Sequence, residues 1–134
     1  MRIVTTPSAS ENVLVDSTGW VEYFGAGPKA EAFAPYLEFP GELLLPSIVV
    51  YEVYKKLLRE RGHAAAERFY SQALRFGERE IRLDAELAAQ AARVSLETRL
   101  AMADAIIYAT ARAHEAQLVT SDPHFGGLPG VILI

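Results

Sequence analysis

The sequence predicts an α/β fold built around a central, mainly parallel sheet of about five strands. Short continuous apolar runs alternate, along 134 residues, with longer segments whose apolar side chains recur at helical spacing. Strands that are apolar throughout are typical of a parallel sheet covered on both faces, because the crossover helices pack on each side. We therefore expect a three-layer α/β/α sandwich.

The predicted elements follow one another between recognisable cap and turn residues. Strands are expected at residues 13–15, 43–45, 81–83, 118–120 and 131–134, and helices at 17–24, 29–39, 48–61, 64–76, 85–98 and 100–115. Ser17 with Thr18, then Ser47, then Asp84 are the expected N-caps, and Gly62 and Gly77 the expected helix ends. Pro35 interrupts the second helix, which is the weakest of the six.

Length and composition indicate one domain, placed at residues 12–134 after a loose polar extension over residues 1–11. The uncharged runs fall short of the ~20 residues of a transmembrane helix, and the apolar stretch at the start is too brief for a signal peptide. We therefore expect no membrane association and a cytoplasmic location. The absence of cysteine excludes disulfides and thiolate zinc sites. A net charge of −4 argues against binding nucleic acid by bulk charge alone, so a phosphate-bearing substrate would need metal ions or a local basic cluster.

The segment from Leu100 to Ala111 contains a single charged side chain, Asp104, within a run of helix-favouring apolar residues. An unpaired buried charge costs several kcal/mol, so this carboxylate needs a cation, a metal, N–H donors or a solvated cleft. A place near the helix start also suits a simple capping role, which is worth roughly 0.3–1 kcal/mol. For Asp104 alone, both interpretations stay open.

Aspartate is scarce, with four residues against thirteen glutamates, and each aspartate lies at an element boundary. Asp16 and Asp122 follow predicted strands, at the sheet edge where open α/β folds bind ligands, whereas Asp84 is expected only to cap a helix. Glu52 and Asp104 lie near the starts of helices that can face the same edge. We therefore expect the carboxylates of Asp16, Glu52, Asp104 and Asp122 to converge in one cleft.

Several carboxylates in one pocket repel one another unless a divalent cation holds them, and such oxygen ligands suit Mg²⁺ or Mn²⁺. A site of this kind indicates phosphate chemistry, and two metals would clamp the attacking and leaving oxygens. Each acid also has an ordinary alternative. Asp16 can cap a helix, Asp122 can initiate a turn before proline, and Glu52 can pair with Lys55 and Lys56 on a helix surface. A shared site explains all four positions at once.

Four motifs carry the acids in order along the chain. They are Val13-Leu-Val-Asp-Ser17, Pro46-Ser-Ile-Val-Val-Tyr-Glu52-Val53, Met102-Ala-Asp104-Ala-Ile-Ile-Tyr-Ala-Thr-Ala111 and Leu118-Val-Thr-Ser-Asp122-Pro-His-Phe125. In this order and spacing, from Val13 to the end, the chain resembles the PIN-domain ribonucleases, most closely the VapC toxins of toxin–antitoxin pairs. The resemblance implies a metal-dependent endoribonuclease whose four acids bind Mg²⁺ or Mn²⁺. Ser17 and Thr120 match hydroxyl positions that accompany the acids in the family.

The resemblance also implies partners, namely an RNA substrate and a cognate antitoxin protein that covers the acid cleft. A homodimer is expected because the aromatic set is larger than one small core comfortably uses. Its members are Trp20, Tyr23, Phe24, Tyr51 and Tyr54. The alternative function is a catalytically idle PIN-like module that only binds a partner protein, although the presence of all four acids favours the enzyme.

Two further groups of side chains are weighed against the same function. Among the histidines, His124 is the one placed to touch substrate, because it follows Asp122 by two residues. Lys55, Lys56 and Arg59 share the Glu52 side of their predicted helix. They predict a solvated helix face, with RNA contact as the alternative.

Overall fold

A five-stranded, wholly parallel sheet forms the centre of the fold. The computed structural model describes residues 12–38 and 42–134. The strands are β1 (Asn12–Val15), β2 (Leu43–Pro46), β3 (Glu80–Ile81), β4 (Ala116–Thr120) and β5 (Val131–Leu133). Their order is β3-β2-β1-β4-β5, and each neighbouring pair is parallel. The predicted α/β class and five-stranded parallel sheet are therefore confirmed.

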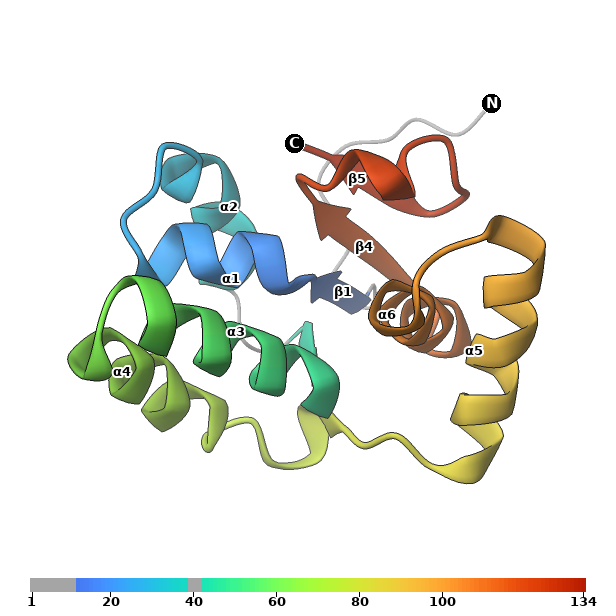
Figure 1. Cartoon of the computed structure of the whole chain (residues 1–134), viewed down its shortest axis with the longest axis horizontal. Coiled ribbons are helices and arrows are strands. Elements are labelled where there is room, and N and C mark those ends of the chain that lie inside the picture. The colour runs from blue at the N-terminus through green and yellow to red at the C-terminus, as the bar shows by residue number, and fades with distance from the viewer. Residues whose placement is uncertain (1–11, 39–41) are drawn as a thin grey trace.

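Six α-helices in the described part of the chain connect and cover these strands. They are α1 (Ser17–Phe24), α2 (Ala30–Leu37), α3 (Ser47–Glu60), α4 (His63–Ala73), α5 (Ala85–Thr98) and α6 (Met102–Ala113). In Figure 1, α1 to α4 gather to one side of β1, and α5 and α6 lie to the other. The apolar strands are thus enclosed by helices, as their composition predicted. No helix in the described ranges is long and apolar enough to cross a membrane.

The core consists of the central strands and the aromatic side chains of the first four helices. Strands β1, β2 and β4 bury nearly every side chain, because neighbours cover both of their faces. Trp20 packs edge-on against Phe69 and Phe76, with ring centroids 5.5 and 5.9 Å apart, and stacks on Phe24. Trp20 is therefore part of the core and Phe24 packs against it, so these two members of the aromatic set do not supply a surface for a partner. Tyr51 differs, because 62% of it is exposed.

Several predicted boundaries were wrong by a few residues. The third strand is Glu80–Ile81 rather than 81–83, because the 3₁₀ turn Gly77–Arg79 (η1) delivers Glu80 opposite Leu45, while Arg82 and Leu83 lie exposed beyond the pairing. Helix α4 ends at Ala73 instead of 76, and α6 ends at Ala113 instead of 115. The predicted helix end at Phe39 and the extension over residues 1–11 lie outside the described residues.

Two predicted caps were also wrong. Ser47 is the first residue of α3, and the capping position falls on Pro46, which offers no side-chain hydrogen bond. Helix α1 is capped by Asp16, whose side chain accepts a hydrogen bond from the backbone N–H of Thr18. The capping residue is therefore a candidate site residue, and the start of α1 is fixed relative to it.

The order of the strands creates a topological switch point between β1 and β4. From β1 the chain passes through α1 and α2 to β2 on one side, whereas from β4 it passes to β5 on the other. Val15 and Val119 are register partners, so the residues that follow them emerge side by side. In open α/β sheets, ligands bind at such a point, outside the carboxyl ends of the strands.

Gly19 allows α1 to pack closely on β1 and α2, so its replacement by alanine is expected to destabilise the fold. A Cβ atom at position 19 would lie 2.4 Å from Cγ1 of Val15 and 2.6 Å from Cδ1 of Phe33. Overpacking of this kind costs about 1–3 kcal/mol. Helix propensity alone favours alanine by about 1 kcal/mol. Urea unfolding should give a lower free energy of unfolding for Gly19→Ala than for the wild type. A higher free energy of unfolding would contradict this account of the packing.

Candidate active site

The buried Asp16 carboxylate lies after the end of β1 and accepts hydrogen bonds from the start of α1 and from the end of β4. Oδ1 accepts hydrogen bonds from the hydroxyl of Thr18 and from its backbone N–H at 3.2 Å. Oδ2 accepts from Oγ1 of Thr120 at 2.8 Å. The side chain is only 2% exposed, so these bonds fix its orientation. Asp16 is therefore both the cap of α1 and a positioned acid.

Thr120, at the end of β4, links Asp16 to the loop that carries Asp122. Its hydroxyl donates to Asp16 and accepts from the backbone N–H of Asp122 at 2.9 Å. On the α1 side, the hydroxyl of Thr18 accepts from the backbone N–H of Ser121 at 3.2 Å. Two threonine hydroxyls thus join the starts of α1 and of the β4 loop, and they place Asp16 and Asp122 close together.

Asp104 joins this group from the first turn of α6. One ligand-type atom from each of Asp104, Asp122 and His124 lies within 4.8 Å of the other two. Nδ1 of His124 lies 3.1 Å from Oδ1 of Asp122, and this carboxylate oxygen also accepts from the backbone N–H of His124. Asp122 therefore caps the short 3₁₀ turn Pro123–Phe125 (η2), in keeping with the predicted turn role, while it faces Asp104.

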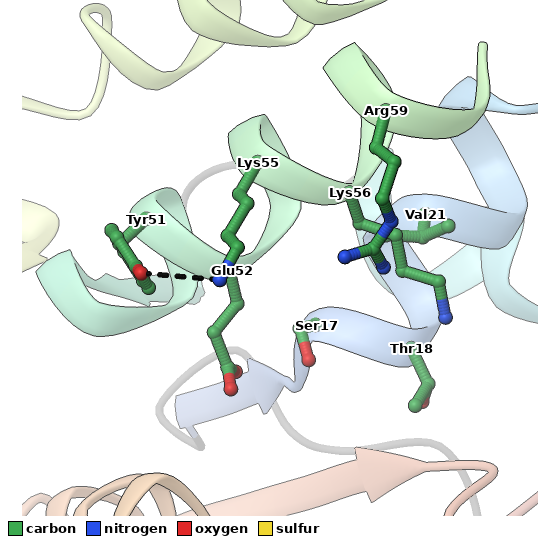
Figure 2. Close-up of a pocket in the computed structure, with 8 residues that line it drawn as sticks. All are labelled: Ser17, Thr18, Val21, Tyr51, Glu52, Lys55, Lys56 and Arg59. Atoms are coloured by element: carbon green, nitrogen blue, oxygen red, sulfur yellow. Dashed lines mark hydrogen bonds between the residues drawn. The ribbon is translucent and has the colours of Figure 1, made fainter.

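Glu52 approaches the other acids from α3. Figure 2 shows its side chain reaching from α3 toward Ser17 at the start of α1. Oε1 of Glu52 is buried, and it has no hydrogen-bond partner among residues 12–38 and 42–134. The predicted ion pairs of Glu52 with Lys55 and Lys56 do not form within these residues. A buried, unpaired carboxylate oxygen is costly unless a ligand binds it.

The electrostatics of the site follow from burial and from the proximity of the acids. Burial raises the pKa of Asp16 to about 6, although hydrogen bonds from Thr18 and Thr120 lower it and the charge of Asp122 raises it slightly. Burial also raises the pKa of Glu52, with the Ser17 hydroxyl opposing the shift and Asp104 adding to it. The pKa of Asp104 is raised by burial and by Asp122, against the influence of His124.

The charges of the four predicted acids act on one another, which indicates that the acids lie in one neighbourhood. Asp104 acts on the charge of Glu52, and Asp122 acts on those of Asp104 and Asp16. Asp84, by contrast, caps α5 by accepting from the backbone N–H of Leu87 at 2.8 Å, as the sequence predicted. The fold therefore gathers carboxylates from β1, α3, α6 and the loop after β4 at the carboxyl edge of the sheet.

Sequence reasoning missed one residue of this arrangement and underrated another. Thr18 was expected only to cap, yet its hydroxyl connects Asp16 to the β4 loop. His124 was expected at most to touch substrate, yet it lies within the acidic group. The signal for each was its spacing, two residues after an aspartate that ends a strand or begins a turn, where side chains commonly bond back to the aspartate.

Comparison with known proteins identifies the family. The profile of the PIN domain matches residues 13–130, which include all four acids. The chain belongs to the PIN-domain family. No curated protein sequence matches the chain.

Solved structures share this PIN fold at low sequence identity. A toxin–antitoxin complex from Klebsiella pneumoniae matches with a TM-score of 0.71 and 24% identity over 90% of this chain and 96% of that one. VapC20 of Mycobacterium tuberculosis, a toxin that cleaves the sarcin–ricin loop, matches with a TM-score of 0.72 and 22% identity over 90% of this chain and 97% of that one. VapBC2 of Rickettsia felis, bound to a DNA fragment of its promoter, matches with a TM-score of 0.66 and 18% identity over 91% of this chain and 96% of that one.

The raised pKa of Asp16 predicts that the metal-free protein is stabilised as the pH falls. The folded-state pKa of about 6 lies above the unfolded value of about 3.9, so the folded state binds the proton more tightly. Lowering the pH from 7 to 5 should therefore add about 1 kcal/mol from this group, and that contribution is lost again as the pH rises through 6.

The difference between the wild type and Asp16→Asn isolates this effect from the other carboxyl groups. Urea unfolding in EDTA at pH 5 and pH 7 should show a gain in the free energy of unfolding that is about 1 kcal/mol larger in the wild type than in the variant, because asparagine caps α1 without titrating. Equal pH dependence in the two proteins would mean that Asp16 is ionised without penalty in the folded chain.

Proposed function

We propose that this PIN domain is a metal-dependent endoribonuclease, the toxin of a VapBC-type toxin–antitoxin pair in the cytoplasm. The observation that supports it best is the gathering of four acids at the strand switch point of the sheet. A carboxylate group there, with hydroxyls that orient it, is typical of sites that hydrolyse phosphodiesters with divalent cations. RNA is the proposed substrate, and Asp16, Glu52, Asp104 and Asp122 are the proposed catalytic residues.

The donor set fits Mg²⁺ or Mn²⁺. Carboxylate oxygens are the hard ligands that both ions prefer, and the unpartnered buried Oε1 of Glu52 is the kind of atom that a cation satisfies. Asp104, Asp122 and His124 offer three further ligand atoms close together. We propose that the four acids bind the metal, with Ser17 and Thr120 positioning Glu52 and Asp16. When bound, the cation would neutralise phosphate charge and lower the pKa of an attacking water.

The chain's own residues prepare the site for that charge. Thr18 and Thr120 hold the Asp16 carboxylate in one orientation, so little reorganisation is needed when an ion binds. Burial, and to a smaller extent the neighbouring acids, raise the pKa values of these carboxyl groups, and a cation bound among them would offset both effects. The acids are consequently arranged for binding positive charge more than for stabilising the metal-free fold.

The structural neighbours support the substrate and partner that we propose. VapC20 is described as cleaving the sarcin–ricin loop, and the Klebsiella structure is a toxin–antitoxin complex. We infer for this chain an RNA substrate and a cognate antitoxin protein. The alternative, an idle PIN-like module that only binds a partner, retains the fold but predicts no cleavage.

Replacing Asp104 with asparagine separates catalysis from folding. The change preserves shape and polarity but removes charge that would offset the cation, so Mn²⁺-dependent RNA cleavage should fall by orders of magnitude. In EDTA the variant should be at least as stable as the wild type, because one repelling charge is removed. A gel assay with labelled cellular RNA in Mn²⁺ and thermal melting in EDTA measure the two effects.

Asp84→Asn is the matched control for this experiment. It also removes an aspartate at a helix start, but from a residue whose only role is to cap α5, and asparagine caps about as well. Its cleavage should equal that of the wild type. Unchanged cleavage by Asp104→Asn would remove Asp104 from the site, and a wild type that never cleaves RNA would favour the idle module.

We also propose that the chain forms a homodimer, supported by an exposed apolar groove between α3 and α4. The groove has a volume of about 850 Å³. The residues that line it are Val50, Tyr51, Tyr54, Lys55, Leu58, Arg59 and Tyr70. Exposed apolar grooves commonly mark interfaces. Light scattering at micromolar concentration should give twice the chain mass of 14.7 kDa, and Leu58→Glu should give a monomer. A monomeric wild type would contradict the proposal.

A further inference from the structure

A row of cations lines the cavity beside the acids. The cavity has a volume of about 280 Å³ and lies between α3 and the start of α1. Lys55, Lys56 and Arg59 form its α3 wall, and Ser17 and Glu52 lie at its acidic end. Figure 2 shows Glu52 and the three cations extending from α3 toward α1. The cavity therefore runs from a proposed metal ligand to a strongly basic surface, which we call the basic wall (Lys55, Lys56 and Arg59).

Within the described residues the basic wall makes few interactions, one of them a long hydrogen bond that Nζ of Lys55 donates to the hydroxyl of Tyr51 at 3.5 Å. Lys55 and Lys56 form no salt bridge with any residue in the described ranges, and the Glu52 carboxylate in the same cavity pairs with neither. Among the residues that the structure describes, Arg59 pairs only with the adjacent Glu60 at 3.3 Å, and both side chains are exposed. Exposed pairs of this kind contribute little, so all three cations are available to an anionic ligand.

The charge of the whole chain makes this local concentration significant. The net charge is −4, so the protein as a whole does not attract a polyanion. Three cations beside an acidic site suit a ligand that carries several negative charges in a row. Lys55 and Arg59 are one helical turn apart, a rise of about 6 Å, so the wall extends along α3 instead of forming a point.

We propose that the basic wall binds the backbone phosphates next to the one cleaved, so that the RNA strand enters the acids along α3. The proposal rests on the proposed nuclease function and adds the path of its substrate. It decides between the two expectations for these cations, a solvated helix face and RNA contact, in favour of contact. Phosphate contacts position a strand without reading its sequence.

Tyr51 favours a nucleic acid over an acidic peptide as the occupant. Its side chain lines the same cavity and is 62% exposed, and Nζ of Lys55 lies 5.5 Å from its ring centroid. An exposed aromatic ring beside a cation is the arrangement on which single-stranded nucleic acids stack their bases. An acidic peptide would use the cations but would leave this ring without a stacking partner.

Binding without cleavage tests the path directly. The probe is a fluorescently labelled single-stranded RNA of mixed sequence, titrated in EDTA at several salt concentrations against the full chain. The test variant is Lys55→Gln/Lys56→Gln/Arg59→Gln. The control, Arg68→Gln/Arg75→Gln/Arg93→Gln, removes the same charge from exposed residues of α4, the turn after it and α5. Circular dichroism and light scattering check that fold and mass are unchanged.

The wild type and the control should share a steep dependence of log Kd on log salt. The test variant should lose roughly 0.7 of slope per phosphate contact, about 2 in all, and bind roughly tenfold or more weakly at low salt. Tyr51→Ala should also weaken binding, and Tyr51→Phe should restore it, because stacking needs the ring and not the hydroxyl. Slopes that are equal in the test and control variants, or no binding by the wild type, would overturn the proposal.

Cleavage in Mn²⁺, measured separately, keeps this proposal apart from the function on which it rests. Equal slopes in a chain that cleaves RNA would overturn the path and leave the nuclease intact. Binding that depends on the basic wall in a chain that never cleaves would support the path and contradict the nuclease. Oligoglutamate serves as an acidic peptide probe in the same titration. If the test variant lost binding to oligoglutamate but bound RNA as the wild type does, the proposal would be overturned in favour of an acidic peptide.

Discussion

The buried carboxylate of Asp16 is the constraint on which the centre of the structure depends. It caps α1, accepts from Thr120 at the end of β4, and lies at the point where the connections of the sheet diverge. Burial disfavours its charge, yet three hydrogen-bond donors point at it, so the fold holds a carboxylate ready for a positive partner. The order of the strands and the chemistry of the site therefore have a common origin.

Around Asp16 the fold separates charges that would otherwise neutralise one another. The acids lie at the carboxyl edge of the sheet. The basic wall follows Glu52 along α3, and Glu52 lines the same cavity as the three cations. A chain of net charge −4 can in this way offer both a cation site and a surface for a polyanion. We propose that the acids carry out cleavage and that Lys55, Lys56 and Arg59 place the RNA strand.

Much of this arrangement could be predicted from the sequence, because the strands are apolar throughout and the aspartates lie at element boundaries. The parallel direction of the strands follows from that pattern, and so does the convergence of Asp16 and Asp122. The short third strand could not be located, because its pairing depends on the turn Gly77–Arg79 more than on its own residues. The surroundings of Glu52 could not be predicted either. Lys55 and Lys56 follow it at helical spacing, which suits ion pairs, but these pairs do not form among the described residues.

The account's central claim is that Asp16, Glu52, Asp104 and Asp122 together bind a divalent cation. Crystals of the wild type soaked in Mn²⁺, measured at the manganese absorption edge, locate the ion without reference to activity. We expect an anomalous peak in direct coordination with at least two of these carboxylates. An ordered ion elsewhere on the chain, with none among the four acids, would contradict the account.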